Sequence, residues 1–439
     1  MTCNNGRNRR LRGVGSLCAA TTAAIVMLLG CIQFDPPPDD GDDGGGDGGS
    51  AAYNNTTDST NKSASYLGSA ACATCHAETA ATHVVHGHGH KLTRVEGNPP
   101  TFPEEGTRAG VPNPPEGFTW EDVSYVIGGY TRKARYIDNE GYVLTTGLTG
   151  VATQWNLSFP ANGTEPGFVA YEPEATEPKP YGFSCFECHT TGAKAQDEDF
   201  PVFEENRPGF IGTWEEPGVQ CEACHGPGSN HVGNTSARDL FVDVSATACG
   251  KCHTRGADPN VIESSGGFIK HHEQWPELLA SGWHAGLNCT TCHDPHVSAN
   301  YARESAIRNE CTACHDDQNM AIHEGKTFTR GDYVEAVSCE SCHMTFATKS
   351  AAAAASTVIG DSARMGDTRT HIFRINASAV DYTQFFTDDG SAVRKDGEGR
   401  AAVTVDFVCL RCHNGIGNAF ELTVESAASI AEDLHDIEQ

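Results

Sequence analysis

Cys221-Glu222-Ala223-Cys224-His225 is one of eight segments of this 439-residue chain that share the pattern Cys-x-x-Cys-His. The eight segments are Cys72–His76, Cys185–His189, Cys221–His225, Cys249–His253, Cys289–His293, Cys311–His315, Cys339–His343 and Cys409–His413. Two thiols three residues apart, with a histidine directly after the second, are typical of c-type haem attachment. The cysteines form thioethers to one porphyrin, and the histidine ligates its iron from one face. Eight motifs therefore predict eight covalently bound haems c and a redox protein.

The motifs predict two sets of cofactor ligands. The residues that attach haem are Cys72, Cys75, Cys185, Cys188, Cys221, Cys224, Cys249, Cys252, Cys289, Cys292, Cys311, Cys314, Cys339, Cys342, Cys409 and Cys412. The first axial ligands of the irons are His76, His189, His225, His253, His293, His315, His343 and His413. No catalytic residue is predicted.

Structural zinc is the alternative use of a Cys-x-x-Cys pair, and a single pair would favour it. Zinc needs a second pair at ribbon-like spacing, however, and it needs no histidine directly after the second cysteine. A disulfide framework is also excluded, because a Cys-x-x-Cys pair is a redox dithiol. The three cysteines outside the motifs all lie near the N-terminus, at Cys3, Cys18 and Cys31.

Twelve histidines lie outside the motifs, which is enough to give every iron a second axial ligand. The predicted second ligands are His86, His90, His231, His271, His272, His284, His296, His323 and His371. Many of them lie close to a motif; His231 follows the third motif, and His296 follows the fifth. The sequence therefore predicts irons with two histidine ligands.

The remaining candidates are less well placed. The histidine-rich segment 83–90 is expected to supply one or two ligands, while His83 itself and His435 are treated as spare. His271 and His272 are adjacent, so their side chains should point in different directions and can serve different haems. After residue 31 the only thioether candidates are Met320, Met344 and Met365. We therefore expect bis-histidine rather than His/Met ligation, which implies lower potentials.

The chain is acidic, with 58 Asp and Glu against 30 Lys and Arg and a formal net charge of −28. Loss of residues 1–30 would remove four arginines and no acids, which leaves −32. Such a surface disfavours nucleic acid and suits cationic partners, metal ions, mineral surfaces or simply solubility. Because the hydrophobic content of 38% is low for this length, we expect haems to form most of the interior.

Residues 1–30 are predicted to be a lipoprotein signal peptide, since a basic region precedes an apolar stretch. This stretch ends in Leu28-Leu29-Gly30-Cys31, which resembles a bacterial lipobox and predicts a lipid anchor at Cys31; simple secretion is the alternative. Ile32 favours the outer membrane by resemblance to bacterial lipoproteins. Residues 31–65, rich in Asp, Gly and Pro, are predicted to form a flexible tether. We expect an outer-membrane lipoprotein or cell-surface protein, with the periplasm as alternative.

The predicted fold is mostly α with much irregular structure, in which packed haems form the core. Residues 66–345 form this multihaem core, with a small β insertion at about 95–180. Strands are predicted at 123–127, 134–137 and 142–145, the last two around a turn. Residues 346–439 hold a second insertion, the eighth haem and a C-terminal amphipathic helix from Val424 to Ile437. The run Ala351–Ala355 extends a helix or forms a flexible connector.

Two stretches resemble a known family. They are the opening Tyr66-Leu67-Gly68-Ser69…Cys72-Ala73-Thr74-Cys75-His76…Gly89-His90-Lys91-Leu92 and Val219–Ser229 followed by His231. Both are similar to multihaem cytochromes c related to the tetrahaem cytochrome of ammonia oxidisers, where such a trailing histidine is a distal ligand. The chain also resembles the outer-surface multihaem cytochromes of metal-reducing bacteria. The resemblance implies electron transfer through packed haems.

Two functions follow from this sequence. The first is an exported electron conduit whose partners are redox proteins or extracellular acceptors, either as a single chain or as a homo-oligomer or filament. The second is an octahaem oxidoreductase that acts on hydroxylamine, nitrite or a sulfur oxyanion. Catalysis at haem needs an exchangeable coordination position. Because all eight motifs keep histidine and spare histidines are abundant, the conduit is favoured over the enzyme.

Overall fold

The computed structural model describes residues 63–436 except 104–106, 198, 200, 236–239, 241, 352–356 and 360–362. The predicted signal peptide, the Cys31 anchor, nearly all of the tether and most of the Ala351–Ala355 run lie outside the described residues. Within the described part, no helix has the combined length and apolar character that a bilayer crossing requires.

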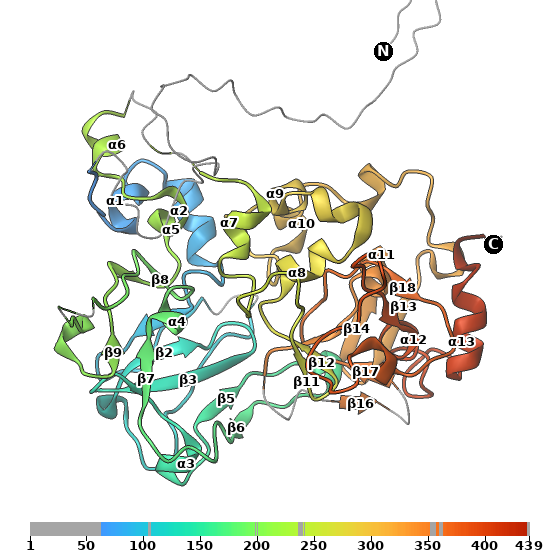
Figure 1. Ribbon diagram of the computed structural model, residues 1–439, viewed down its shortest axis with the longest axis horizontal. Helices are drawn as coiled ribbons and strands as arrows, with labels where there is room; N and C mark the ends of the chain where they lie inside the picture. Colours follow the sequence, from blue (N-terminus) through green and yellow to red (C-terminus); the bar gives the residue numbers. More distant parts are fainter. Residues whose placement is uncertain are drawn as a thin grey trace, which may run out of the picture. The chain divides into compact units, whose positions relative to one another are not determined.

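The largest sheet follows the first motif (Figure 1). Its strands are β1 Leu92–Arg94, β2 Val123–Gly128, β3 Lys133–Asp138, β4 Tyr142–Val143, β5 Gln154–Asn156, β6 Gly167–Val169, β7 Lys179–Gly182 and β9 Phe210–Ile211. They pair in the order β1-β2-β3-β4-β7-β9. In addition, β5 pairs with β3, and β6 pairs with β5. The three strands expected from the sequence are confirmed as β2, β3 and β4.

The turn between β3 and β4 shows why this sequence forms a hairpin. One carboxylate oxygen of Asp138 accepts the backbone N–H groups of Glu140 and Tyr142, each at 2.9 Å. Gly141 takes a φ of 90°, a left-handed conformation that glycine adopts without a steric penalty. The turn therefore fixes the register of β3 against β4.

Both faces of this sheet are buried. Neighbouring residues of β2 belong to different apolar clusters, with Tyr125 in one and Val126 in the other. In β3, Tyr136 and Ile137 divide in the same way. Side chains alternate across a strand, so two covered faces require consecutive apolar residues. The sheet is thus an enclosed wall rather than a surface hairpin.

The other strands form small sheets between motifs. They are β8 Thr190–Thr191, β10 Glu216–Pro217, β11 Ser264–Ser265, β12 Phe268–Lys270, β13 Thr327–Arg330, β14 Tyr333–Ala336, β15 Thr348–Lys349, β16 Thr357–Ile359, β17 Ala363–Met365, β18 Ile375–Asn376 and β19 Val403–Thr404. Parallel pairs join distant segments, with β12 beside β15 and β18 beside β19.

The described helices are short, and none exceeds eight residues. They are α1 Ser69–Ala73, α2 Ala77–Val84, α3 Thr146–Thr149, α4 Phe183–Phe186, α5 Cys221–His225, α6 Ser229–Gly233, α7 Ala246–Gly250, α8 Gln274–Leu279, α9 Cys289–Cys292, α10 Arg303–Ala306, α11 Cys339–His343, α12 Val405–Val408 and α13 Val424–Ala431. The 3₁₀ turns are η1 Trp120–Asp122, η2 Pro160–Asn162, η3 Glu204–Asn206, η4 Gly282–Gly286, η5 Cys311–Ala313, η6 Ala321–His323, η8 Tyr382–Phe385 and η9 Leu434–Asp436.

The expected mostly-α fold is wrong. Only 26% of the structure is helical, 19% is strand, and the main sheet is curled. A motif needs only one helical turn, and the chain leaves the helix directly afterwards. After α5, for example, Gly226 has a φ of 70° and ends the helix. The segments between motifs hold short strands and loops as well as short helices, which lowers the helical share.

The C-terminal helix is confirmed over its first half, as α13. Thr423 caps it, because its hydroxyl accepts the backbone N–H of Ser426 at 3.2 Å. Ala427 lies in a buried cluster together with Leu410, which stands inside the eighth motif. The helix therefore packs beside the last motif, and the chain ends after the short turn η9.

Candidate haem-binding sites

Most of the motifs fold as about one turn of helix. The backbone N–H of the motif histidine then donates to the carbonyl of the first cysteine, as from His253 to Cys249 and from His413 to Cys409, both at 3.0 Å. Residues three and four positions apart in such a turn lie on the same face. The two thiols and the imidazole can therefore meet one porphyrin from one side.

The motif cysteines of the described chain are available for thioether attachment, because none of them is paired in a disulfide. Cys75, Cys311 and Cys314 are exposed, and the others are half-buried. No disulfide joins any of the described cysteines, and none of them is closed off in the apolar core. These side chains fit thioether attachment.

Among the described residues, a second histidine ring lies opposite seven of the eight motif histidines. The pairs and the distances between ring centroids are His76–His231 (6.4 Å), His225–His296 (6.1 Å), His253–His88 and His253–His272 (6.1 Å each), His293–His371 (6.1 Å), His315–His284 (5.8 Å), His343–His435 (6.0 Å) and His413–His323 (6.1 Å). Two imidazoles bound to one iron from opposite sides, at roughly 2 Å per bond, have centroids about 6 Å apart. The protein thus leaves gaps that fit a bis-histidine iron, and its residues fit haem c.

Six of the nine predicted second ligands face a motif histidine. These six are His231, His272, His284, His296, His323 and His371. The second ring usually comes from beside a different motif. His231 follows the third motif but lies opposite His76 of the first, and His296 follows the fifth motif but lies opposite His225 of the third.

The other three predicted ligands have different neighbours. The ring of His86 lies between those of His83 and His88, His90 stacks on Tyr130 at 4.6 Å, and His271 packs against His272. Two histidines outside the predicted set, His88 and His435, do face motif histidines. The only signal for His88 was its place in the cluster 83–90, and no sequence signal singled out His435.

Hydrogen bonds orient several motif imidazoles for metal binding. Nδ1 of His343 lies 2.8 Å from the carbonyl oxygen of Phe373, and Nδ1 of His413 lies 2.8 Å from that of Phe420. A carbonyl oxygen only accepts, so Nδ1 carries the hydrogen and Nε2 is left for iron. Burial also lowers the pKa of His293 to about 4, which keeps that ring neutral, as a metal ligand must be.

His189 is different. Its Nδ1 is hydrogen-bonded to the hydroxyl of Tyr181 at 2.9 Å, and no other described histidine ring lies opposite it. Burial first, and then the charges of Lys91, Arg135 and Lys133, lower its pKa to about 3. Among the described residues, the neighbours of this imidazole are Tyr181, the three cations and, without a ring contact, His272.

The motifs contact one another in an unbroken series. Three pairs of motif cysteines interact through their side chains: Cys72–Cys221, Cys188–Cys252 and Cys249–Cys289. These pairs join the first motif to the third, the second to the fourth, and the fourth to the fifth. Electrostatic interactions between other motif sulfurs join the third to the fourth, the fifth to the sixth, the sixth to the seventh, and the seventh to the eighth. No motif is isolated from the rest.

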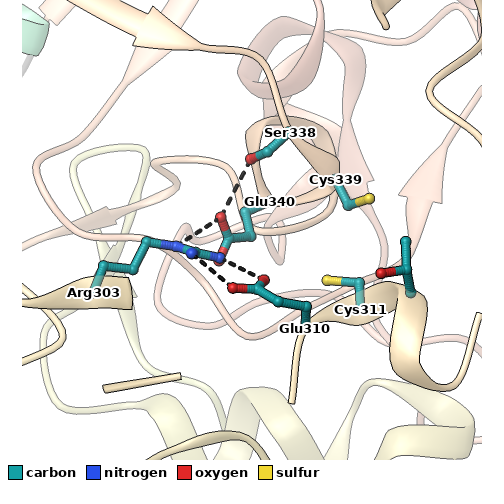
Figure 2. Close-up of a pocket in the computed structure, with 7 residues that line it drawn as sticks. Arg303, Glu310, Cys311, Ser338, Cys339 and Glu340 are labelled. Atoms are coloured by element: carbon teal, nitrogen blue, oxygen red, sulfur yellow. Dashed lines mark hydrogen bonds and ion pairs between the residues drawn. The ribbon is translucent and has the colours of Figure 1, made fainter. Parts of the chain in front are cut away.

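Figure 2 shows how a residue outside the motifs fixes the sixth motif against the seventh. The Arg303 guanidinium donates to Glu310 at 2.9 Å and to Glu340 at 2.5 Å. Glu310 directly precedes Cys311, and Glu340 directly follows Cys339. These side chains line a cavity of about 70 Å³ between the two motifs. Arg303 thus bridges one residue beside the sixth motif and one inside the seventh.

Comparisons with known proteins agree with these sites. The family described as cytochrome c554 and c-prime matches residues 171–226, which include the second and third motifs. The chain is 25% identical over 260 residues to the dissimilatory sulfite reductase MccA of Wolinella succinogenes, covering 52% of this chain and 31% of the reductase. It is 27% identical over 171 residues to the multihaem cytochrome MtrA of Shewanella baltica, covering 36% and 44%. The chain thus spans less than half the length of either relative.

A solved structure shares the fold. The octahaem sulfite reductase MccA of Wolinella succinogenes superimposes with a TM-score of 0.53 at 17% identity, over 84% of this chain and 71% of the reductase. The resemblance to multihaem cytochromes, inferred from the motifs, is therefore confirmed. The chain is a multihaem c-type cytochrome, related to those of metal-reducing bacteria, that binds haem c covalently.

Proposed function

We propose that this protein carries eight haems and transfers electrons through them. The observation that supports the proposal most is the set of seven paired histidine rings at 5.8–6.4 Å. An iron with two histidine ligands has no exchangeable position, so it exchanges electrons rather than substrate. The unbroken series of motif contacts supports transfer along the whole chain, because neighbouring haems would lie close together.

The haem count tests this proposal directly. Intact mass and a haem assay on mature protein should give eight haems per chain, of which at least seven are low-spin. A count of seven or fewer in fully processed protein would remove the premise of one haem per motif. Potentiometric titration should show a broad reduction, because charged neighbouring haems shift one another.

We also propose that the protein works at the cell envelope, as an outer-membrane lipoprotein or at the cell surface, with redox proteins or extracellular acceptors as partners. Support comes from the segment ending in Cys31 and from the acidic stretch that follows it. Cys31→Ser should release the protein from membranes without a change in haem content. A variant that still fractionates with membranes at high salt would show that another feature holds it there. Self-assembly into a filament is compatible with this role.

A second candidate function is an oxidoreductase, and one observation favours it. His189 is the one motif histidine that faces no second histidine ring in the described chain. With His272 bound to the iron of His253, the haem of His189 would have an exchangeable position for hydroxylamine, nitrite or a sulfur oxyanion, and the remaining haems would deliver electrons. One high-spin iron per chain, detected by electron paramagnetic resonance, would support this candidate, and eight low-spin irons would reject it.

A further inference from the structure

Glu277 is a fully buried acid in α8 that faces the segment around His371. Its carboxylate accepts hydrogen bonds from the hydroxyls of Thr348 and Thr370, each at 3.1 Å. It also accepts the backbone N–H of His371 at 2.5 Å. All three groups donate, as an ionised carboxylate requires, because it can only accept. Glu277 is therefore fixed beside the histidine whose ring lies opposite His293 of the fifth motif.

No basic side chain balances this carboxylate. In the part of the chain that the structure describes, no lysine or arginine nitrogen lies within 4.0 Å of Glu277, and its one ion-pair contact is with Nδ1 of His371, at 3.8 Å. Glu335, another buried acid, is by contrast paired with Arg411 and Arg369. A buried carboxylate without a cation is costly. We therefore expect a positive charge beside Glu277 that the described side chains do not supply.

The ring of His371 also lacks a partner. Its Nδ1 is buried and has no hydrogen-bond partner among the described residues. When Nε2 of a histidine binds iron, Nδ1 carries a hydrogen and needs an acceptor. At His343 this acceptor is neutral, the carbonyl oxygen of Phe373. At His371, Oε2 of Glu277 lies 3.8 Å from Nδ1, about 1 Å beyond hydrogen-bond length, so a small shift of the ring would let it donate to a carboxylate.

Another carboxylate near a predicted ligand lies in a different setting. Oδ1 of Asp294 lies 3.2 Å from Nδ1 of His296, but both side chains are partly exposed. Arg308 also pairs with Asp294, at 3.2 Å. Solvent and the arginine screen the charge of Asp294, whereas Glu277 is enclosed and has no such arginine. The charge of Glu277 should therefore act more strongly on a neighbouring iron.

We propose that Glu277 is a positioning residue of the fifth haem, which supplies a counter-charge to the ferric iron and an acceptor for Nδ1 of His371. This inference rests on the proposed electron-transfer function, in which His293 and His371 hold one iron. The ferric haem core has a net positive charge, and reduction removes it by adding one electron, which a neighbouring haem gives up. A fixed negative charge therefore favours the oxidised form and lowers the potential of this haem. Because the fifth motif interacts with the fourth and the sixth, a low-potential step lies within the series.

The test uses the mature haem protein, potentiometric titration and electron paramagnetic resonance. His371→Ala first identifies the fifth haem, as the low-spin signal that disappears. Glu277→Gln removes the charge and keeps an oxygen acceptor. At a fixed applied potential, this variant should raise the ratio of reduced to oxidised fifth haem about tenfold, an upward shift of about 59 mV. The fifth haem should stay low-spin with altered g-values, and the haem content should be unchanged.

Two further variants separate the charge from the fold. Glu277→Asp keeps the charge at a greater distance from the ring, so the ratio should rise only about twofold. Asp367→Asn is the matched control, because Asp367 is a buried carboxylate that accepts the backbone N–H groups of Ser350 and Ala351 but has no hydrogen bond or ion pair with a histidine in the described chain. It should leave the potential of the fifth haem unchanged.

Each other outcome has a defined meaning. If His371→Ala leaves the spectra unaltered, the ligand pair at the fifth motif is rejected, and the role of Glu277 with it. If His371→Ala loses a low-spin signal but Glu277→Gln does not raise the potential, the ligand pair stands and only the role of Glu277 is overturned. A high-spin fifth haem in Glu277→Gln, or an equal shift in Asp367→Asn, would also overturn it. If Glu277→Gln does not accumulate, Glu277→Asp decides, and a potential equal to that of the wild type would then overturn the role.

Discussion

The second motif and the fifth to eighth motifs are surrounded by different kinds of structure. Around His189 the wall is the enclosed sheet, which supplies Tyr181 from β7 and Lys133 and Arg135 from β3. Around the later motifs the walls are loops and short turns, and these bring histidines such as His371 and His435. Loops can deliver one long-range ligand each, whereas a sheet presents a fixed set of side chains. The difference indicates that the sheet creates a chemically distinct site within a series of similar ones.

The comparison is tested most strongly by making a later motif resemble the second one. His371→Ala removes the ring opposite His293 and should convert one low-spin iron to high-spin, which adds one carbon monoxide per chain. His83→Ala is the matched control, because His83 faces no motif histidine, and it should leave the spectra unchanged. Unaltered spectra in His371→Ala would mean that the ring pairs are not ligand pairs.

The next largest effect is expected on the free energy of unfolding, and it concerns a buried charge network that joins the last two motifs. Arg411, inside the eighth motif, binds Glu335 through two hydrogen bonds, and Arg369 adds a third. Burial alone would raise the pKa of Glu335, but these two arginines hold it well below its ordinary 4.5. Glu335→Gln leaves the buried Arg411 without its counter-ion and should lower the free energy of unfolding by about 3 kcal/mol at pH 7.

The direction in which stability changes with pH follows from the lowered pKa of Glu335. The stabilisation by the Glu335 carboxylate is complete above the unfolded value of about 4.5 and is lost as the pH falls through the lower, folded value. The difference between wild type and Glu335→Gln in thermal unfolding should therefore shrink below pH 4.5. Glu304→Gln, at an exposed position, is the control. If the stability difference between wild type and Glu335→Gln grew as the pH fell, the pairing of Glu335 with the two arginines would be contradicted.

A smaller effect is expected where the sheet meets the second motif. Tyr181→Phe removes the hydroxyl that is hydrogen-bonded to Nδ1 of His189 and should shift the potential of that haem by roughly tens of millivolts. The low-spin haems should keep their potentials. Tyr142→Phe changes a tyrosine of the same sheet and serves as control. Equal shifts in both variants would show that the sheet has no specific influence on His189.

The smallest effect should come from the exposed clamp between the sixth and seventh motifs. Arg303→Gln breaks the bridge between Glu310 and Glu340, but the arginine is 40% exposed, so the stability loss should stay below about 1 kcal/mol. The spacing of the two potentials assigned to these haems should change as well. Arg308→Gln, which breaks a comparable pair with Asp294, should leave that spacing unchanged.

Sequence spacing predicted the motif residues that fit haem attachment, but it did not predict which histidine lies opposite which motif histidine. The motif residues and the β2–β4 strands followed from patterns a few residues long, and such patterns are fixed by local geometry. Nothing local indicates that His231 faces His76 rather than the motif beside it, because that choice depends on how distant loops pack. The two-residue strands were missed for a similar reason, since they are too short to show an alternating pattern. His189 illustrates both points: its motif is ordinary in sequence, and its unusual surroundings come from the sheet.

The exchange of histidines between motifs has a consequence for biosynthesis. The ring opposite His76 belongs to His231, and the ring opposite His343 belongs to His435, close to the end of the chain. A growing or truncated chain would therefore carry irons that lack their second ligand until distant segments arrive. On this pairing the sites would not mature independently, and the turn η9 would complete the coordination of a haem attached earlier. Loss of only the final residues from Leu434 onward would expose one internal iron and leave the attachment of every haem intact.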